Sequence, residues 1–242
     1  MKKQKKQKKA EKRRRAVVLS LGGSLLYENG ALSHAALKQK AGAVARAAER
    51  VSLAVVVGGG VKARAAANAA RERGASEFEA DEAAIAATRE NARVFAKTLF
   101  QDFGVHAVYV DDFHKAADLL HRGFTPVMGG QLPGLTTDAC SVLLAELTRA
   151  SRVVNASVVD GVYNKDPKLK GARKFPRLTH EKLVALAAAQ DARRAGQHFV
   201  FDLLACKIAA RSRVRIDFVD GRDAAQFELA LEGRKHKGTI VC

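Results

Sequence analysis

The chain has 242 residues, of which 48% are hydrophobic, and it carries a formal net charge of +17. This content suffices for the core of one α/β domain, or of two closely joined lobes. The three cysteines, Cys140, Cys206 and Cys242, are far apart and belong to no CxxC or Cys/His cluster, so neither a disulfide framework nor a zinc site is predicted. No stretch approaches the roughly 20 apolar residues of a membrane span, and we expect a cytoplasmic protein.

Much of the positive charge lies at the start of the chain. Residues 1–15 contain ten Lys or Arg residues and one glutamate. Like charges at this density repel one another and bury nothing, so we expect a disordered basic tail. The apolar run that follows is interrupted by Ser20, Gly22, Gly23 and Ser24, which argues against a secretory signal. Such a tail is usually a solvated extension, and the alternative is weak electrostatic contact with RNA or another polyanion.

From residue 16 onward, short apolar runs alternate with alanine-rich segments of helical pattern. In chain order we expect a strand at 17–21, a helix at 34–50, a strand at 53–57, helices at 62–73 and 81–98, a strand at 105–110, a helix at 113–121, a strand at 125–128, a helix at 137–149, a strand at 152–154, helices at 179–190 and 203–210, a strand at 214–219 and a helix at 224–231. This alternation predicts a mostly parallel sheet covered by helices on both faces.

Three predicted strands end in glycine clusters, namely GGS at 22–24, GGG at 58–60 and GGQLPG at 129–134. Ligands of parallel sheets gather at the carboxyl ends of the strands. Glycine lets backbone N–H groups approach an anion closely, and the next helix offers its positive N-terminus. One such cluster is as readily a simple tight turn, but three at the same edge predict a site for a polyphosphate or two phosphorylated ligands. The Rossmann GxGxxG and Walker GxxxxGK[ST] motifs are absent.

Five segments carry a family resemblance: VVLSLGGSLL (17–26), VVVGGGVKAR (55–64), PVMGGQLPGLTTDA (126–139), VVDGVYNKDP (158–167) and FDLLACKIAARS (201–212). In this order and spacing they resemble the amino-acid-kinase superfamily, and within it the archaeal-type uridylate kinases. The resemblance covers residues 16–241 and implies a three-layer α/β/α sandwich around a mainly parallel sheet. It implies an acceptor lobe at about 16–150 and an ATP lobe at about 151–242, within a single domain of residues 16–242.

The activity implied by the resemblance is transfer of the ATP γ-phosphate to UMP, with Mg²⁺, in pyrimidine nucleotide biosynthesis by a cytoplasmic homohexamer. The implied ATP contacts are Gly23, Ser24, Gly60, Arg64, Ser157, Tyr163 and Asp166. The implied UMP contacts are Gly59, Asp81, Arg89, Gln131, Leu132, Pro133, Gly134, Leu135, Thr136 and Thr137. Asp138 would be the organising carboxylate and Lys207 the cation near the transferred phosphoryl group, since phosphoryl transfer needs positioning and charge stabilisation.

The chain departs from the family pattern in three places. Ser20 stands where many members have a lysine, which leaves Arg64, Lys62 and Lys207 as candidate replacements. Ser157-Val158 replaces Thr-Asn or Thr-Asp, and Leu203 replaces a proline.

Each assignment has a plainer alternative. Asp138 suits a helix N-cap, and Lys207 suits a solvated helix surface. Tyr163 suits core packing, and Asp166 with Pro167 suits a turn. For the whole chain, the alternatives are another kinase of this fold, acting on isopentenyl phosphate or N-acetylglutamate, and a polyanion-binding regulatory protein on the same scaffold.

Overall fold

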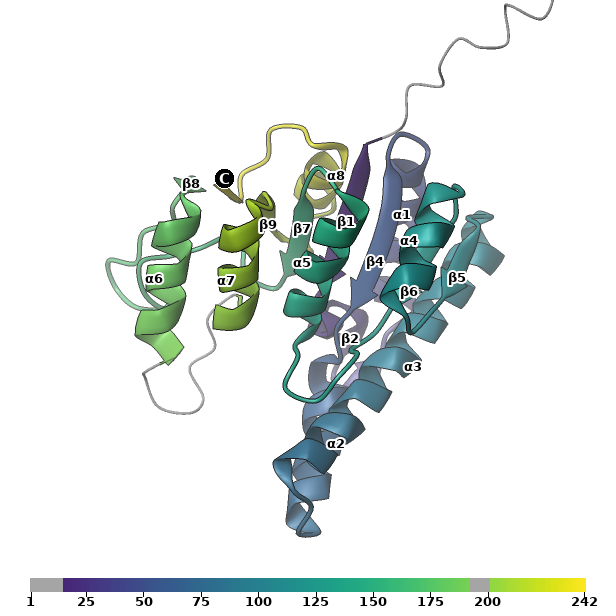
Figure 1. Ribbon diagram of the computed structural model, residues 1–242, viewed down its shortest axis with the longest axis horizontal. Coiled ribbons are helices and arrows are strands. Elements are labelled where there is room, and N and C mark those ends of the chain that lie inside the picture. Colours follow the sequence, from purple (N-terminus) through teal and green to yellow (C-terminus); the bar gives the residue numbers. More distant parts are fainter. Residues whose placement is uncertain (1–14, 192–200) are drawn as a thin grey trace, which may run out of the picture.

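An eight-stranded sheet forms the middle layer of the protein (Figure 1). The computed structural model describes residues 15–191 and 201–242, so the predicted tail, apart from Arg15, lies outside the described residues. The strands are β1 (Ala16–Leu21), β4 (Ser52–Val57), β5 (Ala107–Tyr109), β6 (Thr125–Met128), β7 (Val153–Ser157), β8 (Arg177–Leu178), β9 (Ile216–Asp220) and β10 (Thr239–Val241). Their order is β5-β6-β4-β1-β7-β9-β10-β8, and every pair is parallel except β9 with β10. The predicted mostly parallel sheet is confirmed.

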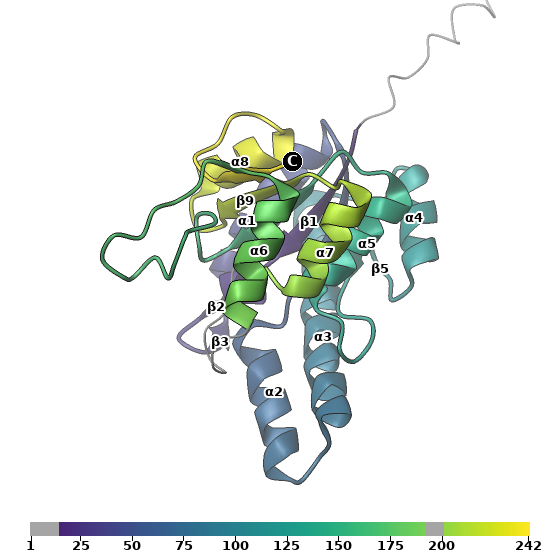
Figure 2. The ribbon, with the colours of Figure 1, turned by 60° about the vertical axis from the view of Figure 1, so that its left-hand side comes forward.

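Helices cover both faces of this sheet, as Figures 1 and 2 show. One face packs against α1 (His34–Ala48), α3 (Glu77–Phe103) and α8 (Ala224–Glu232). The other packs against α4 (Phe113–His121), α5 (Thr137–Thr148), α6 (His180–Asp191) and α7 (Leu203–Ser212). A further helix, α2 (Gly60–Glu72), lies along α3, and this pair projects beyond the sheet. The arrangement is the predicted three-layer α/β/α sandwich.

The central strand β1 shows why the sequence forms this fold. Val17 and Leu19 are fully buried in the core on one face, and Val18 is fully buried in the core on the other. A strand buried on both faces is a continuous apolar run rather than an alternating one. Ser20 is the polar exception, because it is only 3% exposed and lies on the same face as Val18.

Several boundaries differ from the prediction. Helix α3 has 27 residues, and it begins at a capping box formed by Ser76 and Glu79 rather than at Asp81. Strand β7 continues to Ser157, and β5 is only three residues long. The hairpin of β2 (Tyr27–Glu28) and β3 (Ala31–Leu32) was not predicted, although Asn29-Gly30, with φ of 51° and 80°, is a strong hairpin signal. Strands β8 and β10 were also missed, since both are too short to leave a pattern.

Candidate active site

The three glycine clusters lie at the carboxyl edge of the sheet, as predicted. Strands β6, β4 and β1 are parallel neighbours, so their carboxyl ends meet along one edge. The first cluster, at the short 3₁₀ helix Gly23–Leu26, touches the second: a Cβ on Gly60 would lie 2.7 Å from the Gly23 carbonyl carbon and 2.8 Å from the Ser24 nitrogen. Gly60 also has a φ of 61°, which disfavours other residues. Only glycine therefore lets these two turns meet.

Helix α3 holds the second and third clusters through two polar residues that were not predicted. The buried Asn91 donates from Nδ2 to the carbonyl oxygens of Gly58 at 3.0 Å and Gly59 at 3.3 Å. Thr88 Oγ1 accepts a 2.7 Å hydrogen bond from the Gly130 amide. These residues are three positions apart and therefore share one helix face. The sequence signal that could have identified them is a pair of polar residues on one face of an alanine-rich helix.

Two predicted UMP contacts, Asp81 and Arg89, support the loop at 129–135. Asp81 Oδ2 accepts a 2.7 Å hydrogen bond from the Gly134 amide. Arg89 donates from Nε to the Gly130 carbonyl at 3.0 Å and from Nη2 to the Gln131 carbonyl at 3.1 Å. The remaining predicted residues of the loop are Leu132, which is 64% exposed, then Pro133, Leu135, Thr136 and Thr137. The structure thus brings the whole predicted acceptor segment to the carboxyl edge.

Asp138 lies where β1, β7 and α5 converge. Its Oδ1 accepts hydrogen bonds from Ser20 Oγ at 2.8 Å and from Asn155 Nδ2 at 2.9 Å. Within the described part of the chain, no group donates to its Oδ2. The N-cap alternative for Asp138 is wrong, because the cap of α5 is Thr136, whose Oγ1 accepts from the Ala139 amide at 3.0 Å. Ser20 therefore orients this carboxylate.

A second carboxylate, Asp202, stands close to Asp138. It caps α7 by accepting a 2.9 Å hydrogen bond from the Ala205 amide, and its other oxygen accepts from Thr136 Oγ1. Burial raises the pKa of Asp138 to about 7, the negative charge of Asp202 acts in the same direction, and the hydrogen bonds from Ser20 and Asn155 act against it. A carboxyl group in this environment favours a positively charged partner when it ionises.

The predicted contacts to the ATP nucleoside, Ser157, Tyr163 and Asp166, lie at the end of β7 and in the segment that follows it. Ser157 ends this strand beside the first glycine cluster, because a Cβ on Gly22 would lie 3.4 Å from the Ser157 Cα. Tyr163 is half-buried and donates from its hydroxyl to Asp160 Oδ1 at 2.8 Å. Asp160, which was not predicted, also accepts from Lys174 Nζ at 2.7 Å. Asp166 is exposed and accepts from the Lys168 amide at 2.9 Å, as a turn residue does.

The candidate cations differ in whether their side chains already form ion pairs. Lys62 forms an ion pair with Glu90, whereas Arg64 is exposed on α2, one helical turn after Gly60. Lys207 is exposed on α7, across the helix from the buried Ala205 and Ala209. Among the described residues, no ion pair or hydrogen bond involves the side chains of Arg64 or Lys207. The structure does not bring Lys207 into contact with Asp138, and its role stays a prediction.

Comparison with known proteins identifies the family of this chain. The model of the family described as "Amino acid kinase family" matches residues 15–220. The chain belongs to the amino acid kinase family. Its resemblance to the uridylate kinases of archaea within this family is also confirmed by the relatives. A uridylate kinase of Methanothrix thermoacetophila is 42% identical over 228 residues, which cover 93% of this chain and 98% of the relative.

Comparison with solved structures supports the same conclusion about the fold. The crystal structure of uridylate kinase from Archaeoglobus fulgidus superposes with a TM-score of 0.81 at 37% identity, covering 93% of this chain and 99% of that one. The structure of UMP kinase from Bacillus anthracis has a TM-score of 0.80 at 20% identity and covers 94% and 96%, which shows the shared fold. The predicted amino-acid-kinase fold is therefore confirmed.

The carboxylates at this edge suit a metal ion that is bound mainly by substrate phosphates. In residues 15–191 and 201–242, no three His, Cys, Asp or Glu side chains gather into a metal cage. Mg²⁺ is commonly bound by one or two carboxylates together with substrate phosphates. The Asp138 and Asp202 pair at the carboxyl edge of this amino acid kinase fits that description. In the same ranges, no helix is long and apolar enough to cross a membrane.

The raised pKa of Asp138 has a consequence for stability. In the unfolded chain a carboxyl group of this type ionises near a pKa of roughly 3.9, whereas in the fold its pKa is about 7. Between these values the unfolded chain has lost a proton that the native state keeps, so stability falls as pH rises and stays lowered above about 7.

We therefore expect Asp138→Asn to raise the Tm of the ligand-free protein relative to wild type by an amount that grows between about pH 5 and pH 7.5. Scanning calorimetry at several pH values measures this difference. Asp111→Asn, at an exposed position, is the matched control and should show no such trend. A Tm difference for Asp138→Asn that does not change with pH would contradict the raised pKa.

Proposed function

We propose that this amino acid kinase is a UMP kinase, which transfers the γ-phosphate of ATP to UMP and releases UDP and ADP. The observation that carries the proposal is the contact of the Gly23–Ser24 turn with the Gly58–Gly60 turn beside the Asp138 carboxylate. Two glycine turns that meet at one sheet edge suit two phosphate chains facing each other. The name of the relatives, uridylate kinase, supports the same acceptor.

In this proposal the glycine turns hold the donor. The amides of Gly23, Ser24 and Gly60 would bind the ATP phosphates, with Arg64 adding positive charge. Ser157, Tyr163 and Asp166 would contact the ATP nucleoside. Bound Mg²⁺, held by ATP with Asp138 and Asp202 as the protein carboxylates, would supply charge neutralisation. The chain's own contribution is to align donor and acceptor, because phosphoryl transfer is promoted chiefly by positioning and electrostatics.

The acceptor side would be formed by Gly59 and the loop that Asp81 and Arg89 support. The fixed loop would place the UMP phosphate opposite the donor phosphates, and Lys207 would neutralise charge on the transferred group. Asp138, held by Ser20 and Asn155, would orient the groups around that phosphate. We also propose that the enzyme is a cytoplasmic homohexamer in pyrimidine nucleotide biosynthesis, with the acceptor lobe at about 16–150 and the ATP lobe at about 151–242.

An acceptor screen tests the function directly. With Mg-ATP we expect the purified protein to form UDP from UMP, with a kcat/KM at least about tenfold above the values for CMP, AMP and GMP. ADP release in a coupled assay, with UDP identified by chromatography, measures it. Isopentenyl phosphate and N-acetylglutamate belong in the same screen, because they are acceptors of other kinases of this fold. Preference for either of these two acceptors would overturn the assignment of UMP as the acceptor, but the assignment of kinase activity would remain.

A further inference from the structure

The opposite edge of the sheet, where the strands begin, carries a row of arginines. Neighbouring parallel strands β4, β1, β7 and β9 are preceded within two residues by Arg50, Arg15, Arg152 and Arg215, respectively. Backbone hydrogen bonds align them: Ser52 N donates to the Arg15 carbonyl at 3.2 Å and Val18 N to the Arg152 carbonyl at 3.1 Å. Since adjacent strands are about 4.8 Å apart, four cations share about 15 Å of this edge.

The acids at this edge are too few to balance its cations. We define the amino edge as Arg15 with the loops 49–51, 149–152, 213–215 and 232–235. It contains eight Lys or Arg residues and two glutamates, Glu49 and Glu232. The cations are Arg15, Arg50, Arg149, Arg152, Arg213, Arg215, Arg234 and Lys235.

Part of this positive charge is compensated within the fold. Glu232 pairs with Arg50 and Arg234, and the buried Asp217 pairs with Arg152 and Arg215. These ion pairs account for four of the eight cations.

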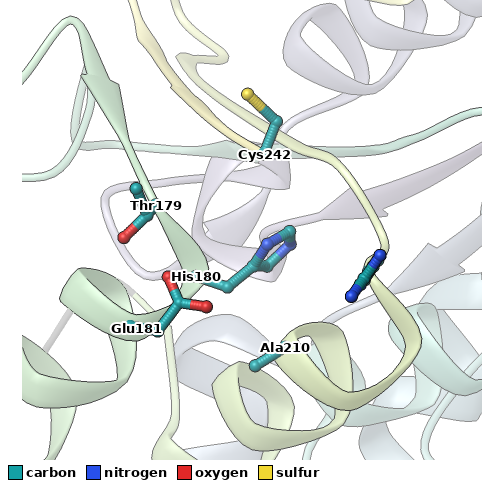
Figure 3. A pocket seen from close by; sticks show the side chains of 6 residues that line it. Thr179, His180, Glu181, Ala210 and Cys242 are labelled. Carbon is teal, nitrogen blue, oxygen red and sulfur yellow. The ribbon is translucent and has the colours of Figure 1, made fainter.

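One further cation of the amino edge meets an acid across a small pocket. The pocket has a volume of about 330 Å³ and is lined by Thr179, His180, Glu181, Ala210, Arg213 and Cys242 (Figure 3). Hydrogen bonds from its own amide and Thr179 lower the pKa of Glu181, and the charge of Arg213 adds to this. Arg15, Arg149 and Lys235 remain exposed, and no described side chain pairs with them.

We propose that the amino edge binds the phosphate backbone of nucleic acid. In the sequence, residues 1–14 precede Arg15 and contain nine further Lys or Arg residues. Guanidinium groups match phosphate oxygens well. Neither this tail nor these loops contain an aromatic residue, so binding rests on phosphates and is independent of base sequence.

The same observations favour nucleic acid over a lipid surface. The apolar residues of the tail are only Met1 and Ala10, and none of the large exposed hydrophobic side chains lies in the amino-edge loops. The surface therefore has nothing to insert into an acyl layer. Because the amino edge is opposite the carboxyl edge, a bound nucleic acid leaves the proposed active site open.

Fluorescence anisotropy of a labelled RNA duplex of about 20 base pairs tests the proposal, using the full chain over a salt series. The variant Arg15→Gln/Arg149→Asn/Lys235→Gln removes three unpaired cations, and asparagine suits the left-handed backbone of Arg149. We expect its affinity near 0.1 M salt to fall by at least about tenfold, and the slope of log K against log salt to decrease by roughly one unit per lost contact. UMP kinase activity should be unchanged.

The matched control is Arg73→Gln/Lys97→Gln/Lys115→Gln, which removes the same charge from exposed positions at the end of α2 and on α3 and α4. Its affinity for the duplex should stay close to wild type. Equal losses in both triple variants, no binding by wild type at low salt, or tighter binding to phosphatidylserine vesicles than to the duplex would each overturn the proposal. Its failure would leave the kinase assignment intact, because the acceptor screen is independent of it.

Discussion

Replacing Asp138 by alanine is expected to lower the kcat of UDP formation by about 10²–10³-fold, with little change in the KM for UMP. Its carboxylate is fixed by Ser20 and Asn155 at the carboxyl edge, and one oxygen is left for the reacting groups. An interaction used in the transition state lowers kcat when it is lost, whereas a binding contact raises KM. Steady-state kinetics with UMP and Mg-ATP measure both.

A conservative variant separates charge from packing at this position. Asp138→Asn keeps the size of the side chain and one oxygen for Ser20, so we expect it to fold and to lose nearly as much turnover. The kcat of Lys207→Ala should be lowered by a similar factor. Its matched control is Arg211→Ala, one turn further along α7. Unchanged kcat in Asp138→Asn would remove this carboxylate from the mechanism, and unchanged kcat in Lys207→Ala would assign Lys207 to the solvated surface.

Much of the fold was predictable because apolar runs and alanine-rich segments alternate regularly. Strand β6 and helix α4 were predicted with their observed bounds. The errors arise where local pattern is weak. The first turn of α3 depends on the Ser76–Glu79 capping box, not on apolar spacing. Strand β10 is three residues long and pairs antiparallel to β9, a pairing set by tertiary packing.

The site was predictable as a set of turns but not as a network. Glycine clusters after apolar runs indicated which edge to inspect, and the strand order confirms that the clusters meet. The side chains that hold them were missed, because Asn91 is 33 residues from Gly58 in the chain. The same holds for Asn155, which meets Asp138 only after β7 and α5 pack together. Long-range polar contacts leave no periodic trace in a single sequence.

Gly60→Ala is expected to disrupt the proposed ATP-binding turn more than any exposed glycine substitution. The added Cβ would approach the backbone of Gly23 and Ser24 to within 2.7–2.8 Å, so the two glycine turns must separate. Overpacking of this kind costs roughly 1–3 kcal/mol. If that cost falls on the ATP-bound state, the KM for ATP should rise by at least about tenfold, since 1.4 kcal/mol corresponds to tenfold in affinity.

The matched control is Gly74→Ala, because both glycines have a positive φ, 61° for Gly60 and 81° for Gly74. Gly74 has no atom within 4 Å of the added Cβ, so it bears only the backbone strain of about 1–2 kcal/mol. Both variants should therefore lose stability, and only Gly60→Ala should lose ATP affinity. Equal KM values for ATP in the two variants would show that the contact between the turns does not form the ATP site. The phosphates would then have to bind elsewhere on the carboxyl edge, with the loop at 129–134 as the remaining glycine cluster.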